Sequence, residues 1–491
     1  MIWENALAFS DRIAVWDNYS NRTYKDLLHR SKEIASFLVN HHRHTKGERI
    51  AFMVDPSFDY LAIQWGIWRA GCIAVPLCLT NPADAIEYVL DDTSPIQIVS
   101  SPGYIDLLKP LASARTIQLI IVEEILSQQA ALPVVRPEDD AMIIYTSGTT
   151  NKPKGVVSTH KNILAQIRML CIGWEISSKD HVLCVLPLHH IHGIIAVVGC
   201  ALFSGGTVEF VSKFSGEEIF RRFIEGRINT FMAVPTVYFK LIAHFEELDK
   251  KRQEELTRAM QGFRLMVSGS AALPVSVMEK WKKISGQILL ERYGMTETGM
   301  TISNPYRGER RPGHIGMPLP GAEVRLADED GKIVTKEPGE IQIRGDMIFS
   351  RYWNRPEATA STFTHDGWFR TGDIAERSEG YFRILGRNST DIIKSGGYKI
   401  SALEIEEKIR EYPGIGDCAV VGMEDEEWGE LISAAVVGAI DLEVKVLSEY
   451  LKTRLAGYKL PRKFIIVKEL PRNAMGKVIK SEVKKLFNAN Q

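Results

Sequence analysis

Apolar and polar residues follow two different rhythms along the first part of the chain. In residues 23–39 apolar positions return every three or four residues, which predicts an amphipathic helix capped by Thr23. Short apolar runs at residues 49–54 and 72–77 predict buried strands instead. The two patterns continue to alternate up to residue 145, so we expect strands and helices to take turns.

The segment between these two strands, residues 56–71, predicts a helix that opens at Pro56 and closes at Gly71. Alternation of the same kind returns in residues 207–234. Repeated alternation is typical of parallel sheets covered by helices, and ligands of such sheets bind at the carboxyl ends of the strands. The chain is therefore predicted to be an α/β protein.

The pattern changes twice further along the chain. Residues 322–345 have the spacing of short alternating strands and predict a small β subdomain. Residues 401–470 predict a compact α+β unit of ordinary domain size. We therefore expect an N-terminal domain over residues 1–387, which includes the β subdomain, and a C-terminal domain over residues 388–491.

Composition narrows the classes of function. The 491 residues are 45% apolar and 25% charged, with a formal net charge of −1, as in globular proteins of more than one domain. Such a balance offers no field for nucleic acid or anionic lipid, and no apolar run is long enough to span a bilayer. The opening residues lack a signal-peptide pattern. We expect a cytoplasmic protein with no nucleic-acid partner and no membrane span.

The six cysteines form no CxxC pair, so the sequence gives little support to a zinc site or a disulfide framework. Most of them lie in apolar runs. Free thiols buried in a reducing compartment are the prediction.

A loop rich in small hydroxyl residues, YTSGTTNKPKGVVSTH (residues 145–160), follows an apolar strand-like run. It is not the common phosphate loop GxxxxGK[ST], because Val156 and Val157 follow Gly155. Its hydroxyls, a glycine and a lysine could still surround phosphate oxygens, although a solvated turn would have a similar composition. The candidate phosphate-binding residues are Thr146, Ser147, Gly148, Thr149, Thr150 and Lys154.

This loop is one of a set of motifs. The run YTSGTTNKPKGV resembles the phosphate loop of the acyl-adenylate-forming (AMP-binding) superfamily, which includes acyl-CoA synthetases, peptide-synthetase adenylation domains and luciferases. Further motifs similar to that superfamily follow in the same order across nearly the whole chain: PLHHIHG (187–193), MVSGSAALP (266–274), ERYGMTETG (291–299), DGWFRTGDIAE (366–376), GYFRILGRNSTDIIKSGGYKI (380–400) and LPRNAMGKV (470–478).

The resemblance implies a large N-terminal domain, a small mobile C-terminal domain, and the use of ATP, Mg²⁺ and coenzyme A. A carboxylate would attack the α-phosphate of ATP and expel pyrophosphate, and a thiol would then attack the acyl adenylate. Both steps develop negative charge, so such a site needs positioned donors and a metal more than a nucleophilic side chain.

The resemblance also implies roles for residues around the nucleotide. Glu297 would be the Mg²⁺ ligand, although alone it would be taken for a capping or surface acid. Tyr293 would offer its ring to adenine, or else be a core aromatic. The remaining nucleotide-binding candidates in these two motifs are Gly269, Ser270, Ala271, Gly294 and Thr296.

Residues on both sides of the expected domain boundary would meet the nucleotide. Asp373 would accept hydrogen bonds from the ribose hydroxyls and Arg387 would reach the same sugar, unless the two only pair with each other. Lys477 would bridge the carboxylate and the α-phosphate during adenylate formation. Lys399 would neutralise the AMP phosphate after the C-terminal domain turns for the thiol step. The sequence leaves open whether Ser389, Thr390 or Asp391 is the pivot.

Arg292 is the most informative residue for the choice of acid. It follows two leucines at the end of a strand, and a buried guanidinium needs an anion there. With His190 and His192 nearby, the pattern resembles the malonyl-CoA synthetases, so one carboxylate of malonate would be activated while Arg292 holds the other. His190 also occupies the gating aromatic position of the superfamily. Alternatively, Arg292 pairs with Glu291 or another acid of the protein.

Other enzyme types share the nucleotide motifs. A short- or medium-chain or aryl acid–CoA ligase would have an apolar acid pocket, against which Arg292 argues. An enzyme that loads an acyl carrier protein is possible but not favoured, and amino-acid activators carry an Asp that residues 231–236 lack. A regulator with a dead site would not need Lys477 and Glu297.

Overall fold

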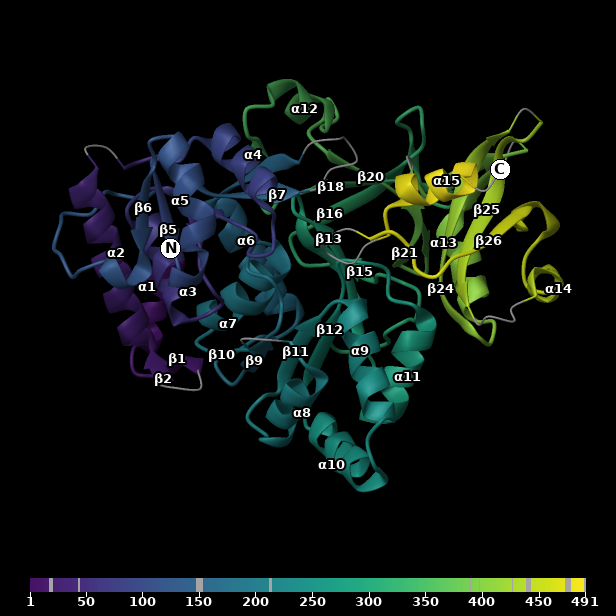
Figure 1. Cartoon of the computed structure of the whole chain (residues 1–491), viewed down its shortest axis with the longest axis horizontal. Coiled ribbons are helices and arrows are strands. Elements are labelled where there is room, and N and C mark those ends of the chain that lie inside the picture. Colours follow the sequence, from purple (N-terminus) through teal and green to yellow (C-terminus); the bar gives the residue numbers. More distant parts are fainter. Residues whose placement is uncertain are drawn as a thin grey trace.

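We describe a computed structural model of the chain, which covers residues 1–16, 21–42, 45–146, 153–211, 214–387, 390–396, 398–425, 427–438, 443–472 and 478–489. The chain forms four sheets (Figure 1): the two large sheets occupy the left and centre of the view, and the last sheet lies at the right, at the C-terminal end of an elongated molecule. The predicted α/β class is confirmed, although the two large sheets are mixed rather than purely parallel.

The first large sheet has the strand order β19-β8-β7-β4-β3-β5-β6. Its parallel core, from β7 to β6, matches the predicted strands, and β8 and β19 are added antiparallel to β7. The strands are β3 (Arg49–Met53), β4 (Ile73–Pro76), β5 (Gln97–Ser100), β6 (Gln118–Ile121), β7 (Asp140–Thr146), β8 (Lys154–Thr159) and β19 (Arg351–Tyr352).

The second large sheet has the order β15-β14-β13-β12-β11-β9-β10-β1-β2 and carries most of the candidate acid and nucleotide residues at one end. Parallel pairing runs from β13 to β1. The strands are β1 (Ile13–Trp16), β2 (Asn21–Thr23), β9 (His181–Cys184), β10 (Thr207–Phe210), β11 (Thr230–Ala233), β12 (Leu265–Ser268), β13 (Leu290–Met295), β14 (Gly299–Ser303) and β15 (Met317–Pro318).

Helices cover both large sheets (Figure 1). The predicted helix after Thr23 is confirmed, and the Thr23 side chain accepts a hydrogen bond from the backbone of Asp26. The helix predicted to open at Pro56 instead begins at Phe58, because Ser57 supplies the cap. The helices are α1 (Ile2–Ala6), α2 (Tyr24–His41), α3 (Phe58–Arg69), α4 (Ala83–Thr93), α5 (Ile105–Ala114), α6 (His160–Gly173), α7 (Cys200–Phe203), α8 (Gly216–Ile224), α9 (Pro235–Glu246), α10 (Lys250–Gln261) and α11 (Val275–Ser285).

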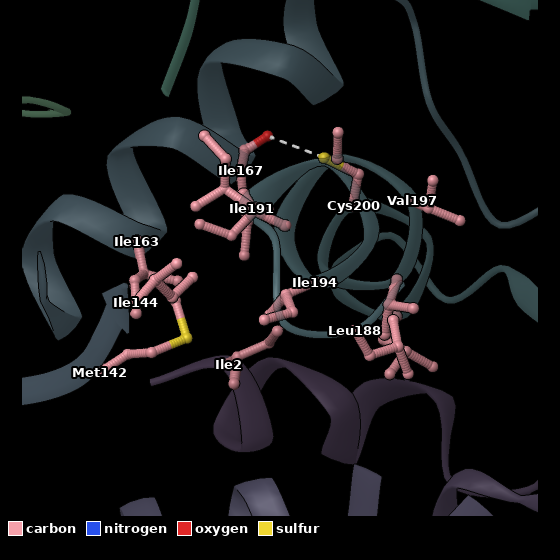
Figure 2. Packing of buried hydrophobic residues seen from close by; sticks show 14 of the residues in the cluster. Ile2, Met142, Ile144, Ile163, Ile167, Leu188, Ile191, Ile194, Val197 and Cys200 are labelled. Carbon is pink, nitrogen blue, oxygen red and sulfur yellow. Dashed lines mark hydrogen bonds between the residues drawn. The ribbon is translucent and has the colours of Figure 1, made fainter. Parts of the chain in front are cut away.

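A π-helical segment, η4 (His192–Gly199), lies in the main hydrophobic core. Figure 2 shows Ile194 of η4 packed between Ile2 of α1 and the isoleucines of α6. The Cys200 thiol directly after η4 reaches the carbonyl oxygen of Ile167 at 3.9 Å. Because η4 is held on these sides, its first residue, His192, has a fixed position at the edge of the core.

The third sheet is the predicted small β subdomain. Its order is β17-β16-β18-β20-β21, and all of its strand pairs are antiparallel. A short helix, α12 (Pro356–Ser361), precedes β20. The strands are β16 (Glu323–Ala327), β17 (Ile333–Val334), β18 (Gly339–Arg344), β20 (Phe369–Ser378) and β21 (Tyr381–Arg387).

The last sheet has the order β23-β22-β25-β24, with β26 beside β25, and it has its own hydrophobic clusters. The carboxylate of Glu407 accepts a hydrogen bond from the backbone N–H of Val275 on α11, at 3.0 Å. The elements are β22 (Ile392–Ser395), β23 (Tyr398–Ser401), α13 (Ala402–Arg410), β24 (Ile415–Asp425), β25 (Gly429–Gly438), α14 (Val444–Lys452), β26 (Lys463–Ile466) and α15 (Lys480–Ala489).

The cysteines and the helix lengths bear on two of the broader expectations. All six cysteines are free thiols, although Cys78 and Cys171 are only half-buried. In the part of the chain that the structure describes, no helix is both long and apolar enough to cross a lipid bilayer.

Candidate active site

Strand β13 carries Glu291, Arg292 and Tyr293 in succession, and all three side chains are buried. Neighbouring side chains of a strand point to opposite faces, so Arg292 and Tyr293 face different surroundings. β13 then turns back into β14, and the turn requires Gly294, because a Cβ at that position would lie 2.0 Å from the carbonyl oxygen of Gly299.

Tyr293 meets the β subdomain on one face of β13. Its hydroxyl donates to Asp373 at 2.5 Å, and the Nε–H of Arg387 donates to the other carboxylate oxygen of Asp373 at 3.0 Å. Asp373 and Arg387 are opposite partners in the β20–β21 register, which explains why they meet. Burial raises the pKa of Asp373, although Arg387 opposes the shift. The ion pair named as an alternative role for these two residues is thus present.

The carboxylate of Glu297 lies close to the positive side chains of Lys154 and Arg387. Its Oε1 accepts a hydrogen bond from the Tyr352 hydroxyl at 2.8 Å, and the Lys154 ammonium lies 4.9 Å from the centre of the same Tyr352 ring. Burial raises the pKa of Glu297, while the Tyr352 hydrogen bond, Arg387 and Lys154 oppose that rise. The carboxylate is therefore buried in a region of positive potential.

A Mg²⁺ ion at a phosphate site takes one or two carboxylates and completes its shell with phosphate oxygens and water. Among the described residues, no three His, Cys, Asp or Glu side chains come together as a metal site. A Mg²⁺ ion that shares its ligands with a phosphate needs only a single carboxylate from the protein, and the buried Glu297 can supply it. The residues present are therefore compatible with Mg²⁺ held jointly with a phosphate.

Arg292 faces the opposite side of β13. One of its terminal N–H groups donates to the Ser270 hydroxyl oxygen at 3.2 Å, and Ser270 lies 3.3 Å from the Nδ1 atom of His192. The guanidinium packs on Gly269, where a Cβ would lie 2.5 Å from Nε. Ser270 has a left-handed backbone (φ 71°), a conformation uncommon for a non-glycine residue and frequent at functional sites.

Arg292 is buried without a carboxylate partner among the described residues. The residue is 3% exposed, and its Nε–H makes no hydrogen bond within those residues. Burial lowers the pKa of Arg292 to about 9, so the guanidinium is still charged at neutral pH. An unpaired buried cation costs several kcal/mol, which makes this position a ready anion site.

His192 adds a second donor. Burial, together with Arg292 and His190, holds its pKa well below the usual value, so the ring is neutral. Ser270 already accepts a hydrogen bond from Arg292, so its own proton points to Nδ1, and the ring proton then lies on Nε2. That Nε2 atom is buried and has no hydrogen-bond partner within the described residues. Two buried donors, on Arg292 and His192, thus lack acceptors near Ser270.

Glu291 does not neutralise Arg292, contrary to one alternative considered from the sequence. Its Oε1 accepts the backbone N–H of Leu273 at 3.0 Å, while Oε2 is buried without a partner in the described residues. Burial raises the pKa of Glu291 to about 8, so at neutral pH this carboxyl group is mostly protonated.

Some of the other candidate residues lie in the described part of the chain, and the rest lie outside it. His190 is half-buried, and its ring centre lies 4.1 Å from that of His189, whose pKa burial lowers to about 3. Thr146 and Lys154 face each other as the last pair of β7 and β8, Thr296 is half-buried, and Ala271 is exposed. Outside the described residues lie Ser147, Gly148, Thr149, Thr150, Lys477 and Ser389, as does the side chain of Lys399.

Tyr352 was not among the site residues expected from the sequence. This residue lies on the short strand β19, next to β8, and contacts both Lys154 and Glu297. The aromatic run RYWN could have drawn attention to it, but its contact with Glu297 joins strand β19 to the turn between β13 and β14, which is distant in sequence.

Comparison with known proteins finds two family models that match this chain. The model of the AMP-binding enzyme family matches residues 2–353, and that of the AMP-binding enzyme C-terminal domain matches residues 404–477. Among curated proteins, a mitochondrial malonate–CoA ligase of Xenopus laevis is 40% identical over an alignment that covers 98% of this chain and 91% of the relative.

Among solved structures, the ATP-bound MatB protein of Rhodopseudomonas palustris is 31% identical, with a TM-score of 0.91 over 99% of this chain and 98% of the other. The apo structure of the same protein has a TM-score of 0.82 at the same identity and coverage. The whole-chain arrangement described here is therefore closer to the ATP-bound structure than to the apo structure.

The buried Glu291 leads to a prediction about stability. Between its ordinary pKa of 4.5 and its folded value of about 8, the folded protein binds a proton that the unfolded chain has released, so stability falls as pH rises. Relative to Glu291→Gln, the free energy of unfolding should fall by up to about 1.4 kcal/mol per pH unit in this window. Urea unfolding at several pH values measures it. Parallel curves for the two proteins would contradict the assignment, and Glu247→Gln, at a side chain 78% exposed, is the control.

Proposed function

The chain belongs to the AMP-binding enzyme family, and from this membership we propose that it is an ATP-dependent acid–CoA ligase that forms malonyl-CoA, AMP and pyrophosphate. The relatives support this proposal, because the Xenopus laevis protein is a malonate–CoA ligase that aligns over nearly the whole chain. The expectation of a cytoplasmic protein stays a prediction, since this relative is mitochondrial.

The observation that carries the proposal is the pair of unsatisfied donors beside Ser270. A buried, charged Arg292 and a neutral His192 both present N–H groups without acceptors in the described residues. A carboxylate would accept from both and would neutralise the guanidinium. A dicarboxylic acid can place one carboxylate there and leave the other for activation. A monocarboxylic acid would leave the cation unpaired, which costs affinity.

The activated carboxylate must reach the α-phosphate of ATP. We assign adenine to the Tyr293 face of β13 and the ribose hydroxyls to Asp373, which would exchange its contacts with Tyr293 and Arg387 for contacts with the sugar. Lys154 and the loop of Thr146, Ser147, Gly148, Thr149 and Thr150 would hold the β- and γ-phosphates. In this scheme β13 keeps the acid and the nucleotide in register for in-line attack.

Glu297 is the proposed Mg²⁺ ligand. Bound there, the ion would neutralise phosphate charge as pyrophosphate leaves. Tyr352 orients the carboxylate through its hydrogen bond to Oε1, and burial keeps competing water away from it. His190 is proposed to stand at the entrance to the acid pocket.

The second step needs a thiol where Lys477 would stand in the first. We propose that residues 1–387 form the N-terminal domain and that residues 388–491 turn as a mobile C-terminal domain between the steps. The turn would withdraw Lys477 and bring Lys399 to the AMP phosphate, opening the path for coenzyme A.

A panel of free acids tests the function. The purified protein with ATP, MgCl₂ and CoA should release pyrophosphate with malonate at a kcat/KM at least about 100-fold above that with acetate, butyrate, octanoate or benzoate. Release should require CoA for multiple turnovers and should stop when EDTA removes Mg²⁺. Preference for octanoate or benzoate would identify a medium-chain or aryl acid–CoA ligase instead. Transfer to an acyl carrier protein in place of CoA would identify a carrier-loading enzyme.

Arg292→Ala tests the acid pocket. Removal of one partner of a buried charge pair commonly costs about 2–5 kcal/mol, so the KM for malonate should rise at least about thirtyfold while the KM for ATP changes little. Arg307→Ala, at a side chain 79% exposed, should leave both constants unchanged. Unaltered malonate kinetics in Arg292→Ala would remove the diacid from the proposal and leave a general acid–CoA ligase.

Lys477→Ala separates the two half-reactions. Pyrophosphate release in a single turnover should fall by orders of magnitude, because this ammonium would stabilise charge on the reacting carboxylate and phosphate. Transfer of preformed acyl adenylate to CoA should change little. An equal loss in both half-reactions would contradict the role, and Lys485→Met, on the same C-terminal segment, serves as the control.

A further inference from the structure

The connection between the third and fourth sheets contains one carboxylate with two strong partners. One oxygen of Asp391 accepts the backbone N–H of Arg387 at 3.1 Å, and the other pairs with the ammonium of Lys480 at 2.9 Å. Arg387 ends β21, whereas Lys480 begins α15, the last helix of the described chain. Asp391 therefore ties the end of the β subdomain to the C-terminal helix.

The backbone and Cβ of Asp391 are held by close contacts with neighbouring residues. The N–H of Asp391 donates back to the carbonyl oxygen of Arg387 at 2.8 Å, and its own carbonyl accepts from Ala402 at 2.8 Å. Gly386 lies against it in a left-handed conformation (φ 133°), and a Cβ there would come within 2.4 Å of the Asp391 Cβ. Only glycine at position 386 allows this approach.

Lys480 is held by more than Asp391. Its side chain is 12% exposed, and its ammonium also pairs with Glu406 at 2.6 Å and donates to the carbonyl of Val420 at 2.9 Å. Burial opposes its charge, but Glu406 and Asp391 outweigh burial, so the pKa of Lys480 is raised. Glu406 and Val420 belong to the same α+β unit, so Lys480 is anchored there and offers a fixed cation to Asp391.

The chain of contacts continues to the candidate nucleotide site. The Arg387 backbone is fixed by Asp391, and the Arg387 side chain pairs with Asp373, which in turn accepts from Tyr293. Lys480 of α15 is thus connected to the Tyr293 face of β13 through four successive polar contacts, of which its own pair with Asp391 is the first.

We propose that Asp391, held by Lys480, is a latch that fixes Arg387 at the nucleotide site during adenylate formation and must release its N–H before the C-terminal unit turns for thioester formation. Asp391 and Lys480 are positioning residues, because neither touches the reacting atoms. This inference rests on the proposed function for its kinetic consequence. Its structural part, the hydrogen bond from Arg387, does not depend on the identity of the acid.

Amide hydrogen exchange of the full-length protein tests the structural part. In Asp391→Ala the Arg387 amide loses its acceptor while the Lys480–Glu406 pair remains, so the peptide covering residues 383–391 should exchange about tenfold faster. Lys480→Met should give a smaller increase, Lys480→Arg should restore slow exchange, and Lys485→Met should match the parent protein. Unchanged exchange in Asp391→Ala would overturn the latch.

The two half-reactions test the kinetic part. Single-turnover pyrophosphate release from ATP and malonate without CoA should slow about tenfold in Asp391→Ala, which is about 1.4 kcal/mol. Transfer of the preformed adenylate to CoA should stay within about twofold of the parent or become faster. Combining Asp391→Ala with Lys480→Met should slow the first step no further than Asp391→Ala alone, because both act through one contact.

The outcomes separate the two proposals. Equal slowing of both half-reactions in Asp391→Ala would overturn the positioning role and leave a contact that only stabilises the fold. A parent protein that releases no pyrophosphate with malonate would contradict the proposed function, while hydrogen exchange would still decide whether Asp391 fixes Arg387.

Discussion

The site is organised around a buried positive charge, on Arg292, for which the described residues provide no carboxylate partner. Arg292 is enclosed by Gly269, Ser270 and the start of η4, and the nearest carboxyl group along its strand, Glu291, is kept protonated by burial. A fold that holds a guanidinium in this way gives up stability at that point. A carboxylate bound beside Arg292 would supply the missing charge. The proposed selectivity for a small diacid would then rest on the same contact that weakens the fold.

Strand β13 brings this charge and the nucleotide residues together. Because its side chains alternate, Arg292 faces Ser270 and His192, while Tyr293 faces Asp373 and Arg387 in the β subdomain. In the proposed assignment, the position of the acid pocket relative to the nucleotide is therefore set by one peptide unit of a strand rather than by a loop. The core around η4 fixes the His192 side, and the β20–β21 register fixes the Asp373 side. The core around η4 and the β subdomain thus meet on opposite faces of β13.

Local patterns in the sequence were enough to predict much of this arrangement. The α2 helix with its Thr23 cap, the alternation of strands and helices, and the β subdomain all follow from periodicity and turn residues. The predicted start of α3 at Pro56 was wrong by a short distance, because the Ser57 side chain caps the helix and the helix therefore begins at Phe58. The contact of Tyr352 with Glu297 and the protonated state of Glu291 could not be predicted, since both depend on burial by segments distant in sequence. The roles given to Lys477 and Thr149 stay predictions, because these residues lie outside the described part of the chain.

The close packing of Gly269 on Arg292 has an evolutionary consequence. A methyl group at position 269 would overlap the Nε atom of the guanidinium, so position 269 cannot take a larger residue unless the Arg292 side chain shifts or is lost. Replacement of the arginine would then have to come before position 269 could accept a larger residue. Across descendants of a common ancestor the two positions should therefore co-vary, and the order of their replacements should be recorded as arginine first.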